Sequence, residues 1–157
     1  MKITLLMMGK TDASCWKDAL EEYRKRLVHY LPFEIEVIPD VKHLKKASET
    51  QQKEREGALL LNSLQAGDVC VLLDENGTEY TSVQFAAYLE RKMHTVAKRL
   101  VFVTGGPYGF SEAVYRAAPE RISLSKMTLS HQMIRPVFAE QLYRAMTILR
   151  NEPYHHQ

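Results

Sequence analysis

The chain alternates between short apolar runs and longer segments in which apolar residues recur every three or four positions. The short runs are almost continuously apolar, which is typical of strands buried on both faces of a parallel sheet. The longer segments place their apolar residues along one side, as helices that cover a sheet do. The pattern predicts strands over residues 2–8, 33–38, 68–74, 99–104 and 121–128, with a turn at Glu75-Asn76-Gly77 ending the third.

Each predicted strand is followed by a helical segment. Asp12 is a candidate cap for the first helix, and either Thr81 or Ser82 can cap the third. Helices are predicted over residues 12–30, 47–64, from 81 or 82 onward, 111–118 and 131–150. Strands that alternate with helices indicate an α/β fold with a mainly parallel sheet and helices on both faces. No Pro-, Gly- or Ser-rich linker interrupts the pattern, so we expect one domain over residues 1–157.

Composition narrows the class of protein. Hydrophobic residues make up 45% of the chain and charged residues 25%, which excludes a disordered chain and a coiled coil. The formal net charge is only +2, so an RNA partner would need local basic residues such as Lys42, Lys45, Lys46, Lys98 and Arg99. The two cysteines lie far apart and the histidines are scattered, which predicts no metal site. The apolar stretch 3–8 is too short for a signal peptide or a membrane span, so a cytoplasmic location is expected.

Candidate chemistry gathers where the predicted strands end, because open α/β sheets bind ligands at the carboxyl ends of their strands. Gly105-Gly106-x-x-Gly109 lies between a strand and a helix, where bare backbone lets a ligand approach. Pro107 breaks the glycine spacing of a dinucleotide fingerprint, and no carboxylate ends the next strand. Both departures count against a dinucleotide-dependent oxidoreductase. By itself, the loop indicates no more than a tight turn.

The segment 124–129 has an unusual composition for a buried strand. It carries Ser125, Lys126 and Thr128 where a central parallel strand would be mostly Val, Ile and Leu. Local failures of sequence rules often mark functional sites. An edge strand with one polar face is the alternative interpretation.

The last helix and the residues after it carry the other candidate groups. Arg135 and Arg144 are predicted to lie off the helix's apolar face, where they could meet a phosphate or a developing anion. Tyr154 and His155 follow Pro153 at the end of the chain. The alternatives are a solvated helix face and a flexible tail.

Short motifs in order along the chain resemble those of the small bacterial SPOUT methyltransferases that modify large-subunit ribosomal RNA. Any one of the motifs is weak, but their order and the total length make the resemblance specific. The motifs are Gly9-Lys10, Trp16, Glu22-Tyr23-x-x-Arg26-Leu27, Ile38-Pro39, Glu54-x-Glu56-Gly57, Leu73-Asp74, Phe102-Val-x-Gly105-Gly106-x-x-Gly109, Leu124-Ser-Lys-Met-Thr-Leu-x-His131, Glu140-Gln-Leu-Tyr-Arg144-Ala and Pro153-Tyr-His155.

The resemblance implies a SPOUT-type α/β knot, with a deep trefoil knot in the C-terminal part, and a homodimer whose knot regions face each other. It also implies that S-adenosylmethionine is the methyl donor. The implied reaction is methylation of N3 of a pseudouridine in the helix 69 loop of 23S ribosomal RNA, within the assembled ribosome. Neither a metal nor a membrane is implied as a partner.

The resemblance also implies site residues. Those expected to bind the cofactor are Leu73, Gly105, Leu124, Ser125, Lys126, Met127, Thr128 and Leu129. The expected catalytic residues are Tyr154 or His155 as the group that meets the base, and Arg144 as the group that stabilises charge on the imide oxygens. The tail of a partner subunit could supply them.

Relatives often carry a basic residue after the Tyr-His pair, whereas His156 and Gln157 stand there in this chain. A phosphate contact from position 156 is therefore expected to be weaker than in those relatives. A non-catalytic ribosome-binding dimer with the same fold is the alternative function. The intact run 124–129 and the intact Tyr154-His155 pair speak against it.

Overall fold

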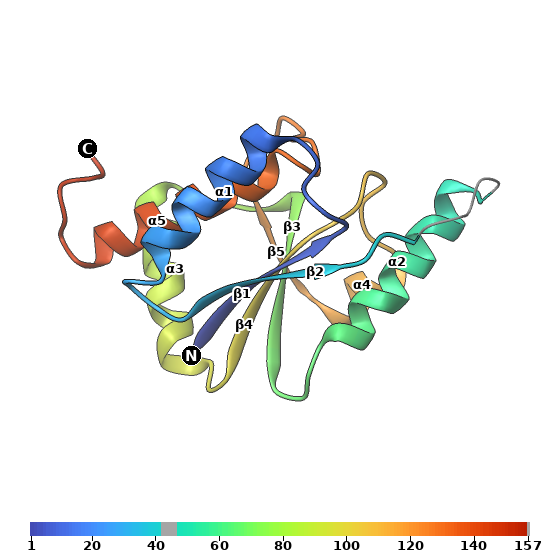
Figure 1. Cartoon of the computed structure of the whole chain (residues 1–157). Coiled ribbons are helices and arrows are strands. Elements are labelled where there is room, and N and C mark those ends of the chain that lie inside the picture. Colours follow the sequence, from blue (N-terminus) through green and yellow to red (C-terminus); the bar gives the residue numbers. More distant parts are fainter. Residues whose placement is uncertain (42–46, 157) are drawn as a thin grey trace.

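A computed structural model describes residues 1–41 and 47–156 (Figure 1). These residues form one five-stranded sheet in the order β2-β1-β4-β3-β5, in which every neighbouring pair is parallel. The strands are β1 (Lys2–Met8), β2 (Phe33–Ile38), β3 (Asp68–Glu79), β4 (Arg99–Thr104) and β5 (Glu120–Ser123). The helices are α1 (Ser14–Leu27), α2 (Glu49–Ser63), α3 (Ser82–Thr95), α4 (Glu112–Ala117) and α5 (Ile134–Leu149). The α/β class and the parallel sheet expected from the sequence are confirmed.

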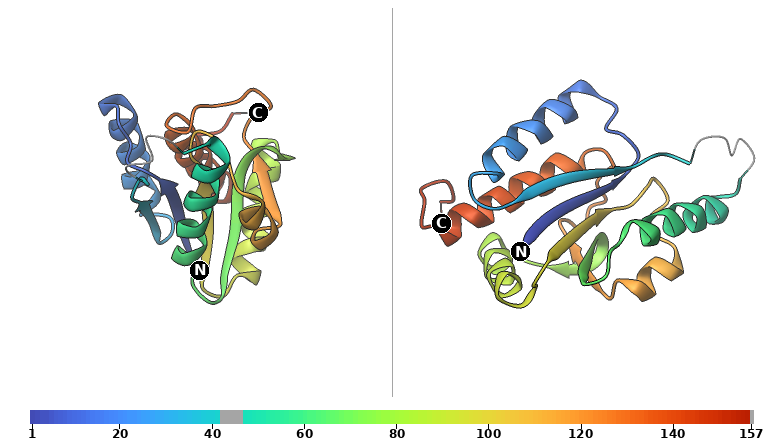
Figure 2. Two further views of the ribbon diagram at one scale, coloured as in Figure 1. Left: turned by 90° about the vertical axis from the view of Figure 1, so that its right-hand side faces the viewer. Right: turned by 60° about the horizontal axis from the view of Figure 1, so that its bottom comes forward.

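Helices cover both faces of the sheet. Helix α5 packs against both α1 and α3 on one face, while α2 and α4 pack together on the other (Figure 2, right). The central strand β4 shows why its sequence is continuously apolar. Leu100 and Phe102 belong to the core under α5, whereas Val101 and Val103 belong to the core under α2 and α4.

Three helices begin at a side-chain cap. Ser48 and Thr81 each accept a bond from the backbone N–H three residues on, in a complete capping box. Ser111 caps α4 by accepting a bond from the Val114 N–H alone. Of the two candidates for the third helix, Thr81 is therefore the cap. The prediction for Asp12 is wrong, because α1 starts after Ala13, and the described residues supply no side-chain bond at that cap.

The third strand does not stop at the predicted turn. It continues through Gly77 to Glu79, and Ile122 of β5 pairs with Leu73 before a register shift and with Thr78 after it. A Cβ at Gly77 would lie 2.6 Å from the backbone nitrogen of Ile122. The missing side chain lets the two backbones touch, so the glycine marks a close crossing instead of a chain reversal.

This contact predicts the effect of Gly77→Ala. Because the nearest atoms belong to the backbone of Arg121 and Ile122, which cannot rotate away, we expect the substitution to lower the free energy of unfolding by about 2–3 kcal/mol. Urea titration of both proteins measures the difference. Asn76→Ala at the exposed neighbouring position is the control and should change stability by less than about 0.5 kcal/mol. Equal stability of the two variants would contradict the close crossing.

The fifth strand is shorter than predicted. It ends at Ser123, and residues 124–133 form a loop before α5. Both sequence interpretations of 124–128 as a strand, central or edge, are therefore wrong. The polar side chains occur there because the segment pairs with no strand among the described residues.

The candidate basic patch is also corrected. Arg99 is 5% exposed and forms ion pairs with Asp68 and Glu36, so it is a structural residue. Lys98 is exposed, and Lys42, Lys45 and Lys46 lie outside the described residues. No helix in the described part of the chain is both long and apolar enough to cross a membrane.

Candidate active site

A cavity of about 490 Å³ opens between the middle of β3 and the carboxyl end of β4. Residues 73–76 within β3, the loop after β4 and the loop before α5 form its walls. It is lined by Leu73, Asp74, Glu75, Asn76, Gly105, Gly106, Pro107, Tyr108, Gly109, Phe110, Tyr115, Leu124, Ser125, Thr128, Leu129, Ser130, His131 and Ile134. Its volume lies in the range of small-molecule and cofactor sites.

Most of the residues expected to bind a cofactor come together in this cavity. The lining includes Leu73, Gly105, Leu124, Ser125, Thr128 and Leu129. Lys126 and Met127 lie outside the wall, and the Met127 side chain is 80% exposed. The hydroxyl of Ser125 accepts a bond from the Met127 backbone N–H at 3.0 Å, which turns the chain there. The structure thus divides the predicted run into lining residues and an outward tip.

Two bonds hold the walls together. The Thr128 hydroxyl donates to Glu75 of β3, and this bond connects the loop before α5 to that strand. The Tyr115 hydroxyl donates to Asp74, and burial and this carboxylate raise the pKa of Tyr115 to about 12. The tyrosine therefore stays protonated at neutral pH and keeps Asp74 in place.

The charges around the cavity have one sign. Asp74 and Glu75 line it, whereas neither lysine nor arginine is among the described residues that do so. Such a lining favours a ligand that carries positive charge. Glu75 and Asn76 are expected from the sequence to form a turn, and their place in the cavity lining is not predicted by it. The signal that could have found them is their position after a buried strand end.

Arg135 does not face solvent or the cavity, which corrects the sequence expectation. Its side chain is fully buried and donates to the carbonyl oxygens of Met8 and His131 and to the Thr11 hydroxyl. Burial lowers the pKa of the guanidinium. Arg135 therefore joins the loop after β1 to the start of α5 and is not available to an external phosphate.

The predicted catalytic residues form a second cluster at the far end of α5. Arg144 lies 3.3 Å from the Nδ1 atom of His155 and pairs with Glu140, while the Tyr154 hydroxyl donates to Glu140 at 3.1 Å. The Tyr154 oxygen also lies 3.3 Å from the hydroxyl of Tyr23 on α1. Burial and these two bonds raise the pKa of Tyr154. The structure thus brings Arg144, Tyr154 and His155 together.

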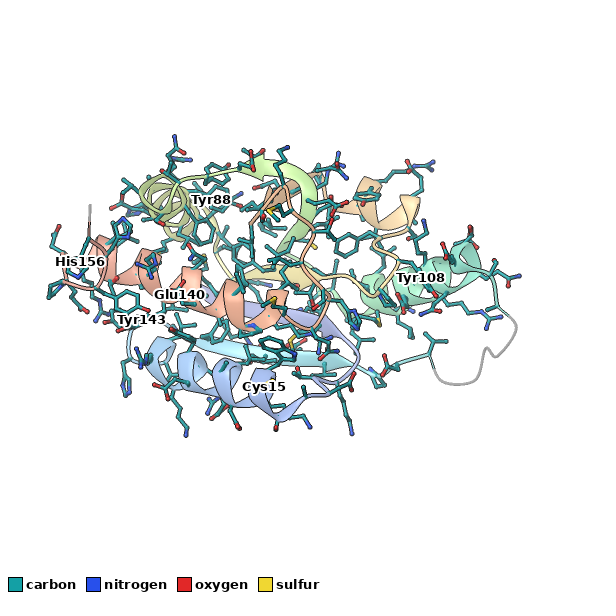
Figure 3. The ribbon with its side chains drawn as sticks, turned by 90° about the horizontal axis from the view of Figure 1, so that it is seen from above. Cys15, Tyr88, Tyr108, Glu140, Tyr143 and His156 are labelled. Atoms are coloured by element: carbon teal, nitrogen blue, oxygen red, sulfur yellow. The ribbon has the colours of Figure 1, made fainter. Side chains whose placement is uncertain are left out.

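The cluster and the cavity are separate within one chain. Ile134 lines the cavity, and Arg144 lies ten residues further along the same helix, which corresponds to about 15 Å. Figure 3 shows Tyr108 of the cavity wall at one end of the molecule and Glu140 and His156 toward the other. A single chain therefore does not bring its own Arg144, Tyr154 and His155 to its own cavity.

Comparison with known proteins shows the family of the chain. A family model described as "Predicted SPOUT methyltransferase" matches residues 1–155. The chain is 69% identical to a protein of Parabacteroides distasonis, 59% to one of Phocaeicola vulgatus and 55% to one of Flavobacterium johnsoniae, each over the full length of both chains. All three relatives are named "Ribosomal RNA large subunit methyltransferase H". The chain belongs to the SPOUT methyltransferase family.

Proposed function

We propose that the protein transfers a methyl group from S-adenosylmethionine to large-subunit ribosomal RNA. The observation that carries the proposal is the acidic cavity between the middle of β3 and the carboxyl end of β4, formed by segments that the resemblance selected. The names of the relatives supply the RNA class. The specific atom that we propose to be methylated is N3 of a pseudouridine in the helix 69 loop, within the assembled ribosome.

The residues of the cavity suit the donor. Leu73, Leu124 and Leu129 offer apolar surface for the faces of an adenine ring, and Gly105 leaves backbone open to its edge. Asp74 and Glu75 complement a positively charged ligand. When bound, S-adenosylmethionine supplies an electrophilic methyl group on a sulfonium. The cavity residues hold that end of the ligand and orient it toward the entering base.

The second cluster supplies the groups that the RNA base needs. The N3 proton of the base must leave, because a neutral imide is a poor nucleophile. Tyr154 or His155 meets the base, and Arg144 stabilises the charge that spreads over the imide oxygens. Glu140 and Tyr23 hold Tyr154 and Arg144 in position through the bonds described above.

A homodimer places the two clusters side by side. In a symmetric dimer with antiparallel α5 helices, the tail of one subunit reaches the cavity of the other. The support is the separation of the clusters within one chain, together with the exposed apolar side chains of Met127, Met133 and Tyr108 near the cavity. Neither a metal nor a membrane belongs to this proposal, and its setting is the cytoplasm.

The deep trefoil knot belongs to the same proposal. Residues 74–77 cross next to β5, and Ile122 pairs with the strand on either side of that crossing. The support for the knot, in which the chain passes through a loop of its own backbone, is the membership of the chain in the SPOUT family.

The test is transfer of radiolabelled methyl from S-adenosylmethionine to ribosomes that lack the modification, with free ribosomal RNA alongside. We expect label in the assembled ribosomes, mapped to the helix 69 pseudouridine, and much less in free RNA. Label at another nucleotide would overturn the finer target. No label in either sample, with cofactor binding intact, would favour the non-catalytic ribosome-binding dimer.

A further inference from the structure

A second, smaller cavity lies beside the large one, between α2 and the loop 105–110, which we call the glycine loop. Its volume is about 10 Å³, close to the room that one water molecule needs. Gly105, Gly106, Gly109 and Phe110 line both cavities, so both border the same loop. The remaining walls come from Met8, Lys53, Glu56, Gly57, Leu60, Ser111 and Val114.

Glu56 is the unusual residue of this cavity. It is 6% exposed, and its Oε1 atom accepts a bond from Gln52 at 3.0 Å. Its Oε2 atom is buried and has no partner within residues 1–41 and 47–156. A Cβ at Gly106 would lie 2.4 Å from this oxygen, so the carboxyl group lies directly against the bare backbone of the loop.

A buried carboxylate oxygen without a partner calls for an explanation. The other buried side-chain atoms without partners in the described residues are the hydroxyls of Thr104 and Ser123. Burial raises the pKa of Glu56, the charge of Asp40 adds to this effect, and His131 opposes it. The surroundings thus disfavour the carboxylate, and a positive group placed beside Oε2 would relieve that penalty.

We propose that Glu56 binds the ammonium group of the amino-acid end of the methyl donor and that Lys53 binds its carboxylate. The inference rests on the proposed function, because it extends the site for the same ligand. An amino-acid end carries one ammonium and one carboxylate, and the small cavity offers one side chain of each opposite charge. An ammonium group also matches a cavity with room for about one water molecule. This assignment gives a function to Glu56 in the motif Glu54-x-Glu56-Gly57, which the large cavity leaves unused.

The test compares two ligands that differ at the amino-acid end. S-Adenosylhomocysteine carries this end, whereas 5′-methylthioadenosine has the same nucleoside and a methyl group in its place. Both have an uncharged sulfur, so calorimetric titration of both isolates the amino-acid contacts. For Glu56→Gln we expect at least a tenfold loss of affinity for S-adenosylhomocysteine and less than a twofold change for methylthioadenosine.

Two further variants sharpen the test. Lys53→Met removes the other charge at a partly exposed position, so it should fold normally and lose about fivefold for S-adenosylhomocysteine alone. Glu54→Gln, an exposed position on the same helix, is the control and should change neither affinity.

The outcomes separate this inference from the proposed function. An equal loss for both ligands in Glu56→Gln would show that Glu56 only supports the loop and would overturn the assignment. Unchanged affinity for both ligands would overturn it as well. Failure of the unmodified protein to bind either ligand would instead overturn the cofactor assignment itself.

Discussion

Removal of residues 154–157 is expected to lower methyl transfer to ribosomes by at least about 10³-fold and to leave the affinity for S-adenosylhomocysteine within about twofold. The reason is the division of the site into two clusters. The tail carries Tyr154 and His155, whereas the cavity residues lie at the other end of α5. Groups that accept a proton or stabilise developing charge each contribute about 10²–10⁴ in rate.

The smaller change Tyr154→Phe isolates the hydroxyl group. It removes the bonds to Tyr23 and Glu140 but keeps the ring that packs against Tyr143 with a centroid separation of 4.8 Å. A loss of rate without a loss of cofactor affinity would place the hydroxyl in the reaction. Full methyl transfer by the truncated chain would rule out the tail as a source of catalytic groups.

Mixed dimers test whether the tail acts on the partner subunit. One chain lacks residues 154–157, and the other carries Leu124→Arg, which blocks the cavity with a charged side chain. If the tail of one subunit serves the cavity of the other, the mixed dimer keeps one intact site, while each homodimer has none. Restored activity on co-expression is the expected result. No activity in purified mixed dimers would contradict the assignment to the partner.

The sequence pattern was sufficient for the sheet because the sheet is buried on both faces. Residues 100–103 are all apolar, and the structure places them alternately in the two cores. The same rule failed at 124–128, because Leu124 and Leu129 line the large cavity and Leu124 packs against the core from a loop. Leucine has the same hydropathy in both places, so the pattern could not separate a strand from a cavity wall.

The site could be predicted in part for a related reason. The glycine loop is a local signal, and the resemblance supplied Leu73 and the residues of 124–129. The contact between Glu56 and Gly106 joins residues fifty positions apart. No local pattern contains it, and the same holds for the pairing of Ile122 with both halves of β3.

Arg135 is the clearest error of the sequence analysis and gives the prediction with the largest expected effect on stability. The helical pattern predicted it off the apolar face, because a charged side chain is rarely buried without a partner. The structure buries it fully, and its partners Met8 and Thr11 lie more than a hundred residues earlier in the chain. A long-range set of acceptors therefore decides its position.

Arg135→Met should lower the free energy of unfolding by about 3 kcal/mol. The substitution leaves the Met8 carbonyl oxygen, the part-buried His131 carbonyl oxygen and the Thr11 hydroxyl without the Arg135 donor, at a cost of about 1–3 kcal/mol for each buried group left unsatisfied. Relief of the buried charge offsets part of that cost, as the lowered pKa of Arg135 indicates. Urea unfolding at equal protein concentrations measures the change. The control is Arg144→Met at a partly exposed position, which should cost less than about 1 kcal/mol.

Arg135→Met should also weaken binding of S-adenosylhomocysteine. The reason is that Arg135 bonds to the carbonyl of His131, a residue that lines the cavity. Arg144→Met should leave this affinity unchanged. A stable Arg135→Met protein with unchanged cofactor affinity would show that these three bonds neither hold the fold nor shape the cavity.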